Sequence, residues 1–135
     1  MADFAITIGA VVPIVADVVS KAAGLRLLVL HGSRARATHR PDSDWDFAYL
    51  ADASFDADAL LAGLSEALGS NDIDLADLSR ASGLLRFKAA SEGHAVHEAQ
   101  PGQFDTFRLA AAAAWCDMEP VLRRAFDARL ESTTP

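Results

Sequence analysis

Apolar residues recur at helical spacing near both ends of the chain and gather into short runs between them. Over residues 11–22 they return every three or four positions, which predicts a helix with Pro13 in its first turn and Gly24 as its stop. Residues 25–30 then hold four consecutive apolar side chains before Gly32, a pattern typical of a buried central strand.

The middle of the chain alternates between strand and helix signals. Residues 45–50 predict a second strand, 72–78 a third and 95–98 a fourth. Between the second and third strands, apolar positions at helical spacing over residues 60–68 predict an amphipathic helix, with Asp56 as its N-cap and Gly69 as its stop. A shorter helix is expected over residues 82–90.

The tail, residues 104–130, has apolar residues every three or four positions, which predicts one long helix or two, kinked or split by Pro120. Its apolar members, whose aromatic residues we expect in the core, are Phe107, Ala111, Trp115, Met118, Leu122, Phe126 and Leu130. The element order predicts a mixed α/β (α+β) fold with a sheet of about four strands flanked by helices. We expect one domain over residues 1–135, with a core at about 25–98 and a C-terminal helical segment at about 103–131.

Composition supports a folded domain and limits its chemistry. The chain has 135 residues, of which 51% are hydrophobic, so one core can form without disulfides or structural metal. Its only cysteine, Cys116, excludes an internal disulfide and a cysteine-rich zinc site, and we expect it to be buried. The net charge of −7 disfavours direct binding of nucleic acid and favours a basic protein partner.

The apolar start of the chain is not typical of a targeting signal or a membrane span. It has no basic leading segment and is interrupted by Pro13 and Asp17. We therefore expect a cytoplasmic protein without membrane attachment.

Candidate chemistry gathers where the first predicted strand ends and the second begins. Gly32 and Ser33 follow the apolar strand, and the absence of a side chain at Gly32 lets the backbone approach a phosphate, with Ser33 supplying a hydroxyl. Ten residues later come Asp44 and Asp46, which lie two apart at the start of a strand and should project from the same side. Two such carboxylates suit Mg²⁺.

A third carboxylate is expected on the third strand. Asp74 lies between Ile73 and Leu75, where an acid is costly unless a cation or partner is present. Asp77 is the competing candidate, and Asp72 shares the face of Asp74 but lies nearer the turn.

Three further residues near these carboxylates each have two possible roles. Arg34 and Arg36 could bind the β- and γ-phosphates of a nucleotide, since a guanidinium matches phosphate oxygens, or they could be solvated loop charges. His31, at the end of the first strand, could touch substrate or could be a hydrogen-bonded structural histidine.

The pattern of Gly32-Ser33, ten residues, Asp44-Trp45-Asp46 and then Asp74 in a strand resembles the DNA polymerase β-like nucleotidyltransferase superfamily over residues 25–78. The short chain and helical tail look more narrowly like the minimal nucleotidyltransferase antitoxins, which are encoded beside HEPN-domain ribonuclease toxins. Ala37 departs from the family pattern, in which glycine often stands at this position.

The resemblance implies a magnesium-dependent enzyme that transfers AMP from ATP to a hydroxyl, expected to be a tyrosine, of a HEPN toxin and so inactivates it. It also implies that two Mg²⁺ ions bridge Asp44, Asp46 and the triphosphate, with Asp74 completing one metal site and helping to deprotonate the hydroxyl. Gly32, Ser33, Arg34 and Arg36 would bind the nucleotide.

Two alternatives stay open at this point. The acceptor could be a small molecule such as an aminoglycoside, although this chain has little room for the extra domain that holds the drug. The protein could instead be a non-catalytic antitoxin that neutralises its toxin by forming a complex.

Overall fold

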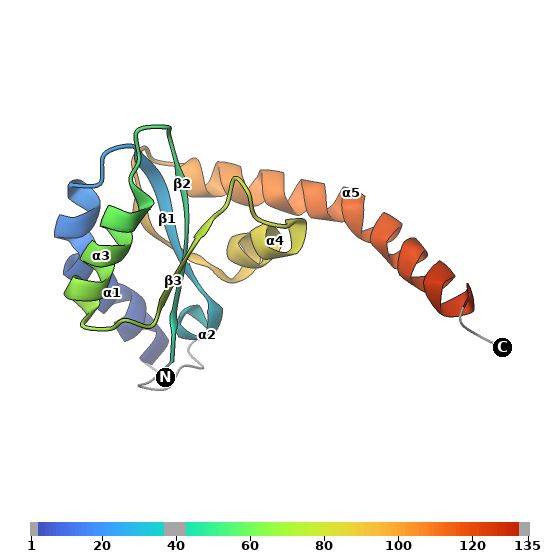
Figure 1. Cartoon of the computed structure of the whole chain (residues 1–135), viewed down its shortest axis with the longest axis horizontal. Coiled ribbons are helices and arrows are strands. Elements are labelled where there is room, and N and C mark those ends of the chain that lie inside the picture. Colours follow the sequence, from blue (N-terminus) through green and yellow to red (C-terminus); the bar gives the residue numbers. More distant parts are fainter. Residues whose placement is uncertain (1–2, 37–42, 133–135) are drawn as a thin grey trace.

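A single mixed sheet with two helices on each face forms the body of the protein (Figure 1). The structure is a computed structural model and describes residues 3–36 and 43–132. In chain order its elements are α1 (Asp3–Ser20), β1 (Leu25–His31), α2 (Gly32–Ala35), β2 (Trp45–Ala51), α3 (Ala57–Leu68), β3 (Ile73–Asp77), α4 (Gly83–Glu92), β4 (His94–Glu98) and α5 (Gln103–Ser132).

The strand order is β3-β2-β1-β4. Strand β1 pairs antiparallel with both β2 and β4, whereas β2 and β3 run parallel and are joined through α3. Parallel neighbours need such a crossover, and the residues between them form a helix with the predicted caps: Asp56 accepts from the backbone N–H of Ala59, and Gly69 adopts φ +64°. The predicted mixed four-stranded fold is confirmed.

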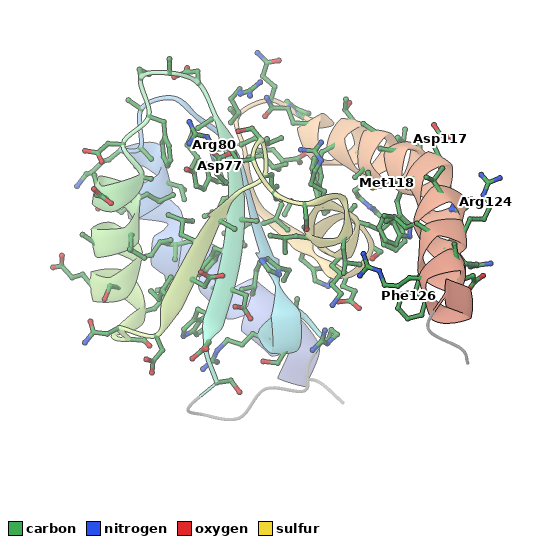
Figure 2. The ribbon with its side chains drawn as sticks, turned by 45° about the vertical axis from the view of Figure 1, so that its right-hand side comes forward. Asp77, Arg80, Asp117, Met118, Arg124 and Phe126 are labelled. Atoms are coloured by element: carbon green, nitrogen blue, oxygen red, sulfur yellow. The ribbon has the colours of Figure 1, made fainter. Side chains whose placement is uncertain are left out.

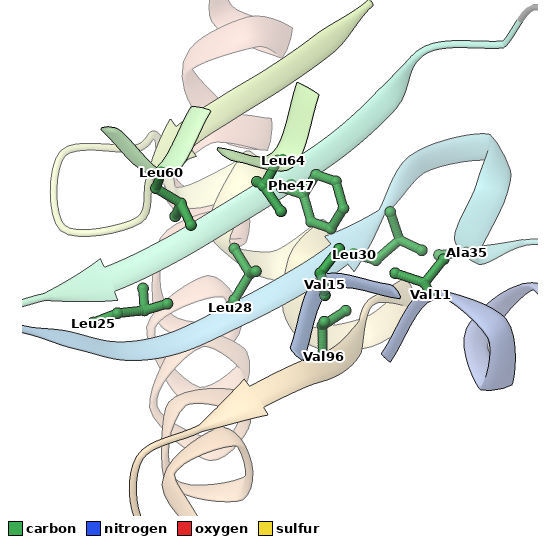
Figure 3. Close-up of a cluster of buried hydrophobic side chains, with 10 residues drawn as sticks. All are labelled: Val11, Val15, Leu25, Leu28, Leu30, Ala35, Phe47, Leu60, Leu64 and Val96. Carbon is green, nitrogen blue, oxygen red and sulfur yellow. The ribbon is translucent and has the colours of Figure 1, made fainter. Parts of the chain in front are cut away.

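Two apolar clusters lie on opposite faces of the sheet. Helices α1 and α3 cover one face, where Phe47 of β2 packs beside Leu60 and Leu64 of α3 (Figure 3). Helices α4 and α5 cover the other face, where Ala48 of β2 packs in one cluster with Phe107 of α5. Strand β1 contributes to both clusters by alternation, so it is the buried central strand that its apolar run predicts.

The helices differ from expectation at both ends of the chain. Helix α1 starts at Asp3, well before the predicted position 11, so Pro13 lies inside the helix and removes one backbone hydrogen bond there. At the other end, α5 is assigned as one helix through Pro120 rather than split, and Figure 1 shows it bending as it leaves the sheet.

The predicted burial of the tail is only half right. Phe107, near the start of α5, is 5% exposed, but Phe126 is 62% exposed, because the distal half of the helix extends beyond the sheet (Figure 1). Cys116 is exposed, contrary to expectation. In the part of the chain that the structure describes, no helix is long and apolar enough to cross a membrane.

Candidate functional site

Three side chains from three neighbouring strands form a row across one end of the sheet. His31 ends β1 and pairs with Asp46 near the start of β2, and Asp46 pairs in turn with Asp74 near the start of β3. Paired residues on adjacent strands project from the same side of a sheet, with about 5 Å between strands. The predicted proximity of Asp74 to the Asp44-Trp45-Asp46 tripeptide thus follows from strand register.

The row lies on the face covered by α4 and α5. Ala48, two residues after Asp46, and Ala76, two residues after Asp74, both belong to the apolar cluster on that face. Asp44 lies two positions before Asp46 and is exposed, as is Asp74. The carboxylates therefore open to solvent at the end of the sheet, beyond the cover of the helices.

Gly32 is shaped for the side chain of Asp46. Its φ is +74°, in the left-handed region that favours glycine, and a Cβ built on it would come within 2.2 Å of the Asp46 Oδ2. The carboxylate of Asp46 thus rests against the backbone that begins α2. Gly32, predicted to let the backbone approach a phosphate, therefore also leaves the space that the carboxylate of Asp46 occupies.

Charge accumulates at this end of the sheet. Burial raises the pKa of Asp46, and the neighbouring carboxylates of Asp74 and Asp44 raise it further, while His31 and Arg36 act in the opposite direction. A divalent cation between these groups would relieve their mutual repulsion.

The donor set fits a magnesium ion by its chemistry, because Mg²⁺ prefers carboxylate oxygens, waters and phosphates. Among the described residues, no three Asp, Glu, His or Cys side chains converge closely enough to enclose an ion. Asp44, Asp46 and Asp74 would therefore have to turn toward one another around a cation.

His31 lies at the buried end of the row. It is 9% exposed, and its Nε2 has no hydrogen-bond partner in the described part of the protein. Burial lowers the pKa of His31, although Asp46 and Asp74 and a hydrogen bond with the backbone of Phe47 oppose this shift. Burial thus favours the neutral form of the ring. A hydrogen-bonded structural histidine, as expected, would explain the nitrogen that bonds the Phe47 backbone but not the Nε2.

Asp77, the competitor of Asp74, lies toward the other end of β3, opposite Tyr49. Its Oδ1 accepts hydrogen bonds from the backbone and hydroxyl of Ser79, and its other oxygen is 3.9 Å from Arg80 Nε. Figure 2 shows Asp77 and Arg80 together at the turn that follows the strand. Asp77 caps this turn, and strand register favours Asp74 as the third carboxylate.

The two arginines of the motif have different surroundings. Arg36 is exposed, and its Nη1 lies 3.1 Å from the Glu92 Oε2 at the end of α4. Arg34 is buried, and its guanidinium contacts Ser43 and Trp45. Arg36 is thus the more accessible of the two for a phosphate, whereas the guanidinium of Arg34 is engaged with the chain around Asp44. The sequence does not predict the contact of Arg36 with Glu92, because the two residues are far apart in the chain and nothing in the segment around Glu92 links it to residue 36.

A groove of about 750 Å³ between α1 and α3 lies on the opposite face of the sheet from the carboxylates. Its lining includes Val18 and Leu60, with Asp17 and Lys21 already paired at 3.0 Å. It contains none of the predicted site residues, so the candidate site is the carboxylate end of the sheet.

Comparison with known proteins identifies the family of this chain. The family described as polymerase beta, nucleotidyltransferase matches residues 15–101, which include β1, β2 and β3. The chain belongs to this family of nucleotidyltransferases.

Particular relatives resemble it over most of its length. The chain is 32% identical to the protein adenylyltransferase MntA of Aphanizomenon flos-aquae, over 62% of its own length and 64% of that protein's length. The match thus spans slightly less than two thirds of that relative.

Solved structures with the same fold come from toxin–antitoxin pairs. A chain of a toxin–antitoxin crystal structure with AMP-PNP superposes with a TM-score of 0.74 at 24% identity, covering 88% of this chain and 98% of that one. A second comes from the tri-AMPylated Shewanella oneidensis HEPN toxin in complex with its MNT antitoxin, with a TM-score of 0.65 at 22% identity, covering 94% and 98%. At these identities the likeness establishes the shared fold.

Proposed function

We propose that this protein is an antitoxin enzyme that transfers AMP from ATP to a hydroxyl, expected to be a tyrosine, on a HEPN-domain ribonuclease toxin. The observation that carries the proposal is the register of β2 and β3, which sets Asp46 beside Asp74 in a chain of the nucleotidyltransferase family. The similarity to a protein adenylyltransferase supports the acceptor class, and the AMP-PNP complex of a structural relative supports ATP as the donor.

In this proposal Asp44, Asp46 and Asp74 hold Mg²⁺, which when bound neutralises charge on the triphosphate. Asp44 immediately precedes β2 and Asp46 is the second residue of the strand, so both can approach the nucleotide's metal from the start of β2. Asp74 faces Asp46 from the next strand and accepts the proton of the attacking hydroxyl.

The reaction forms a bond from the acceptor oxygen to the α-phosphorus. The bond from that phosphorus to the bridging oxygen breaks, and pyrophosphate leaves with the electron pair. The backbone at Gly32, the hydroxyl of Ser33 and the guanidinium of Arg36 bind the triphosphate, with Arg36 exchanging Glu92 for phosphate oxygens.

The product explains inactivation by charge. An added AMP carries a phosphate close to a centre that must bind RNA phosphates, so it repels the substrate and occupies space. We expect the protein to act in the cytoplasm, where ATP is available, without contacting nucleic acid directly.

The test is the intact mass of a HEPN-domain protein encoded beside this chain, after co-expression with wild type or with Asp44→Asn/Asp46→Asn. Mass gains equal to one or more AMP units with wild type alone are expected. If both versions neutralise the toxin and neither changes its mass, the protein is a binding antitoxin and the proposed activity is wrong.

A further inference from the structure

Arg34 is a charged side chain buried beneath the motif, and burial of a guanidinium needs a reason. It is 8% exposed, whereas Arg36, two positions later, lies at the surface. Removing a guanidinium from water costs desolvation energy that its contacts must offset, so packing alone does not favour arginine here. The contacts of the guanidinium indicate what it does instead.

The guanidinium holds both neighbours of Asp44 in the sequence. Arg34 Nε and Nη2 donate to the carbonyl oxygen of Ser43, at 3.2 Å and 2.9 Å, and this carbonyl belongs to the peptide group that precedes Asp44. The same guanidinium carbon lies 3.9 Å from the centre of the Trp45 ring, the residue that follows Asp44. One planar group therefore restrains the chain on each side of this aspartate.

The contact comes from the side of the sheet opposite the carboxylates. Trp45 packs against the apolar cluster beneath α1 and α3, whereas Asp46 projects to the other face. A guanidinium stacked on the Trp45 ring thus supports the strand start from behind. The backbone of Trp45 is also held, since its N–H donates to the Asp72 carbonyl oxygen at 2.8 Å.

We infer that Arg34 is a positioning residue that sets the direction of Asp44 and Asp46, and not a ligand of the nucleotide. The inference rests on the proposed function, because it presumes that these aspartates hold a metal. Lysine cannot replace it fully, since an ammonium lacks the planar fork that reaches one carbonyl with two nitrogens and stacks flat on an indole ring.

A matched control exists elsewhere in the fold. Arg108 Nε donates to the Ala90 carbonyl oxygen at 3.0 Å, and its guanidinium lies 5.4 Å from the Phe104 ring centre. Arg108 thus combines the same two kinds of contact between α4 and α5, with a half-exposed side chain that also lies 3.8 Å from Asp105. Arg108→Met should remove a carbonyl and ring contact without changing the aspartates.

The experiment measures Tb³⁺ binding without nucleotide, by luminescence that tryptophan sensitises. All proteins carry Trp115→Phe, which leaves Trp45 as the single tryptophan of the two. Arg34→Met should raise the Kd for Tb³⁺ about tenfold or more, as loss of a group that orients metal ligands does, and Arg34→Lys by less. Arg108→Met should leave this Kd unchanged. Thermal unfolding by circular dichroism checks that each variant is folded at the assay temperature.

The outcomes separate the two proposals. If Arg34→Met and Arg34→Lys bind Tb³⁺ as the parent does, and Arg34→Met instead weakens AMP-PNP binding, Arg34 is a phosphate ligand and the inference is overturned. If Arg34→Met is unfolded, a Kd for Arg34→Lys equal to that of the parent overturns it. If the parent protein binds no Tb³⁺, the metal site of the proposed function fails, and the positioning role fails with it.

Discussion

The carboxylate end of the sheet and the distal half of α5 depart from an ordinary folded domain in opposite ways. At the carboxylate end, polar groups are buried or crowded: among residues 3–36 and 43–132 the Nε2 of His31 meets no hydrogen-bond partner, Arg34 is buried, and burial and like charges raise the pKa of Asp46. In residues 118–129 of α5, large apolar side chains are exposed instead, namely Met118, Val121, Leu122 and Phe126.

Figure 2 shows how the distal half of α5 is arranged. Met118 and Phe126 point to the inner side of the bend, toward the body of the protein, while Asp117 and Arg124 point away from it. The helix keeps an amphipathic pattern where no sheet lies beneath it. Stability should therefore be insensitive to the distal half of α5, whereas activity should depend on the crowded groups at the carboxylate end.

The largest difference between an effect on activity and an effect on stability is expected for the two aspartates of β3. Asp74→Asn should lower AMP transfer by about a thousandfold, because a metal ligand and proton acceptor is worth several kcal/mol in the transition state. Asp77→Asn should keep activity and lower only stability, since its carboxylate caps the turn at Ser79. Transfer rates and unfolding curves of both variants show which aspartate serves catalysis and which serves stability. Loss of transfer in Asp77→Asn with normal transfer in Asp74→Asn would assign the third carboxylate to Asp77.

Gly32→Ala should lower the rate of AMP transfer strongly and the free energy of unfolding only moderately. A residue other than glycine at a left-handed φ destabilises the folded protein by about 1–2 kcal/mol. The new Cβ also displaces the Asp46 carboxylate, and misplacement by about 1 Å can cost on the order of a hundredfold in rate. Rates measured below the melting temperature separate the two effects. A fully active Gly32→Ala variant would show that Asp46 need not rest against this backbone.

Within α5, two phenylalanines should behave differently. Phe107→Ala removes a buried ring from the core and should lower the free energy of unfolding by about 3–5 kcal/mol. Phe126→Ala removes an exposed ring and should change it by less than about 0.5 kcal/mol in the isolated protein. Denaturant unfolding measures both. An equal loss for the two variants would mean that the distal half of α5 is packed in solution.

Asp46→Asn should stabilise the metal-free protein at neutral pH while abolishing transfer. Because the pKa of Asp46 is raised in the folded state, the native protein binds its proton more tightly, and stability falls as pH rises through the raised pKa. The variant should therefore melt higher than wild type at pH 7, with no such advantage below about pH 3.9, the ordinary value for aspartate. A lower melting temperature for the variant at pH 7 would contradict the crowding described here.

Much of the fold follows from local patterns. The apolar run of β1, the caps at Asp56 and Gly69 and the strand over residues 45–50 are each predicted from neighbouring residues, and each is confirmed. The start of α1 and the exposure of Phe126 are not predictable in this way. Periodicity defines a helix face but does not reveal where the covering sheet ends.

The same distinction holds for the candidate site. Asp46 and Asp74 could be placed together because strand periodicity and the family motif agree. The surroundings of Arg34 could not, since its contact depends on which face the Trp45 ring occupies and on a carbonyl nine positions away. The turn-capping role of Asp77 is likewise not predictable from the sequence. The hydrogen bond from Ser79 to its carboxylate forms only because β3 ends at Asp77 and the chain turns there.

The central claim is nucleotidyl transfer by the carboxylate end of the sheet, and the position of a label in ATP tests it most directly. Purified protein, Mg²⁺ and the proposed HEPN-domain partner are incubated with ATP labelled at the α-phosphorus or at the γ-phosphorus. The account predicts that wild type transfers only the α-label and that Asp44→Asn/Asp46→Asn transfers neither. Transfer of the γ-label, or of the α-label by the double variant, would contradict it.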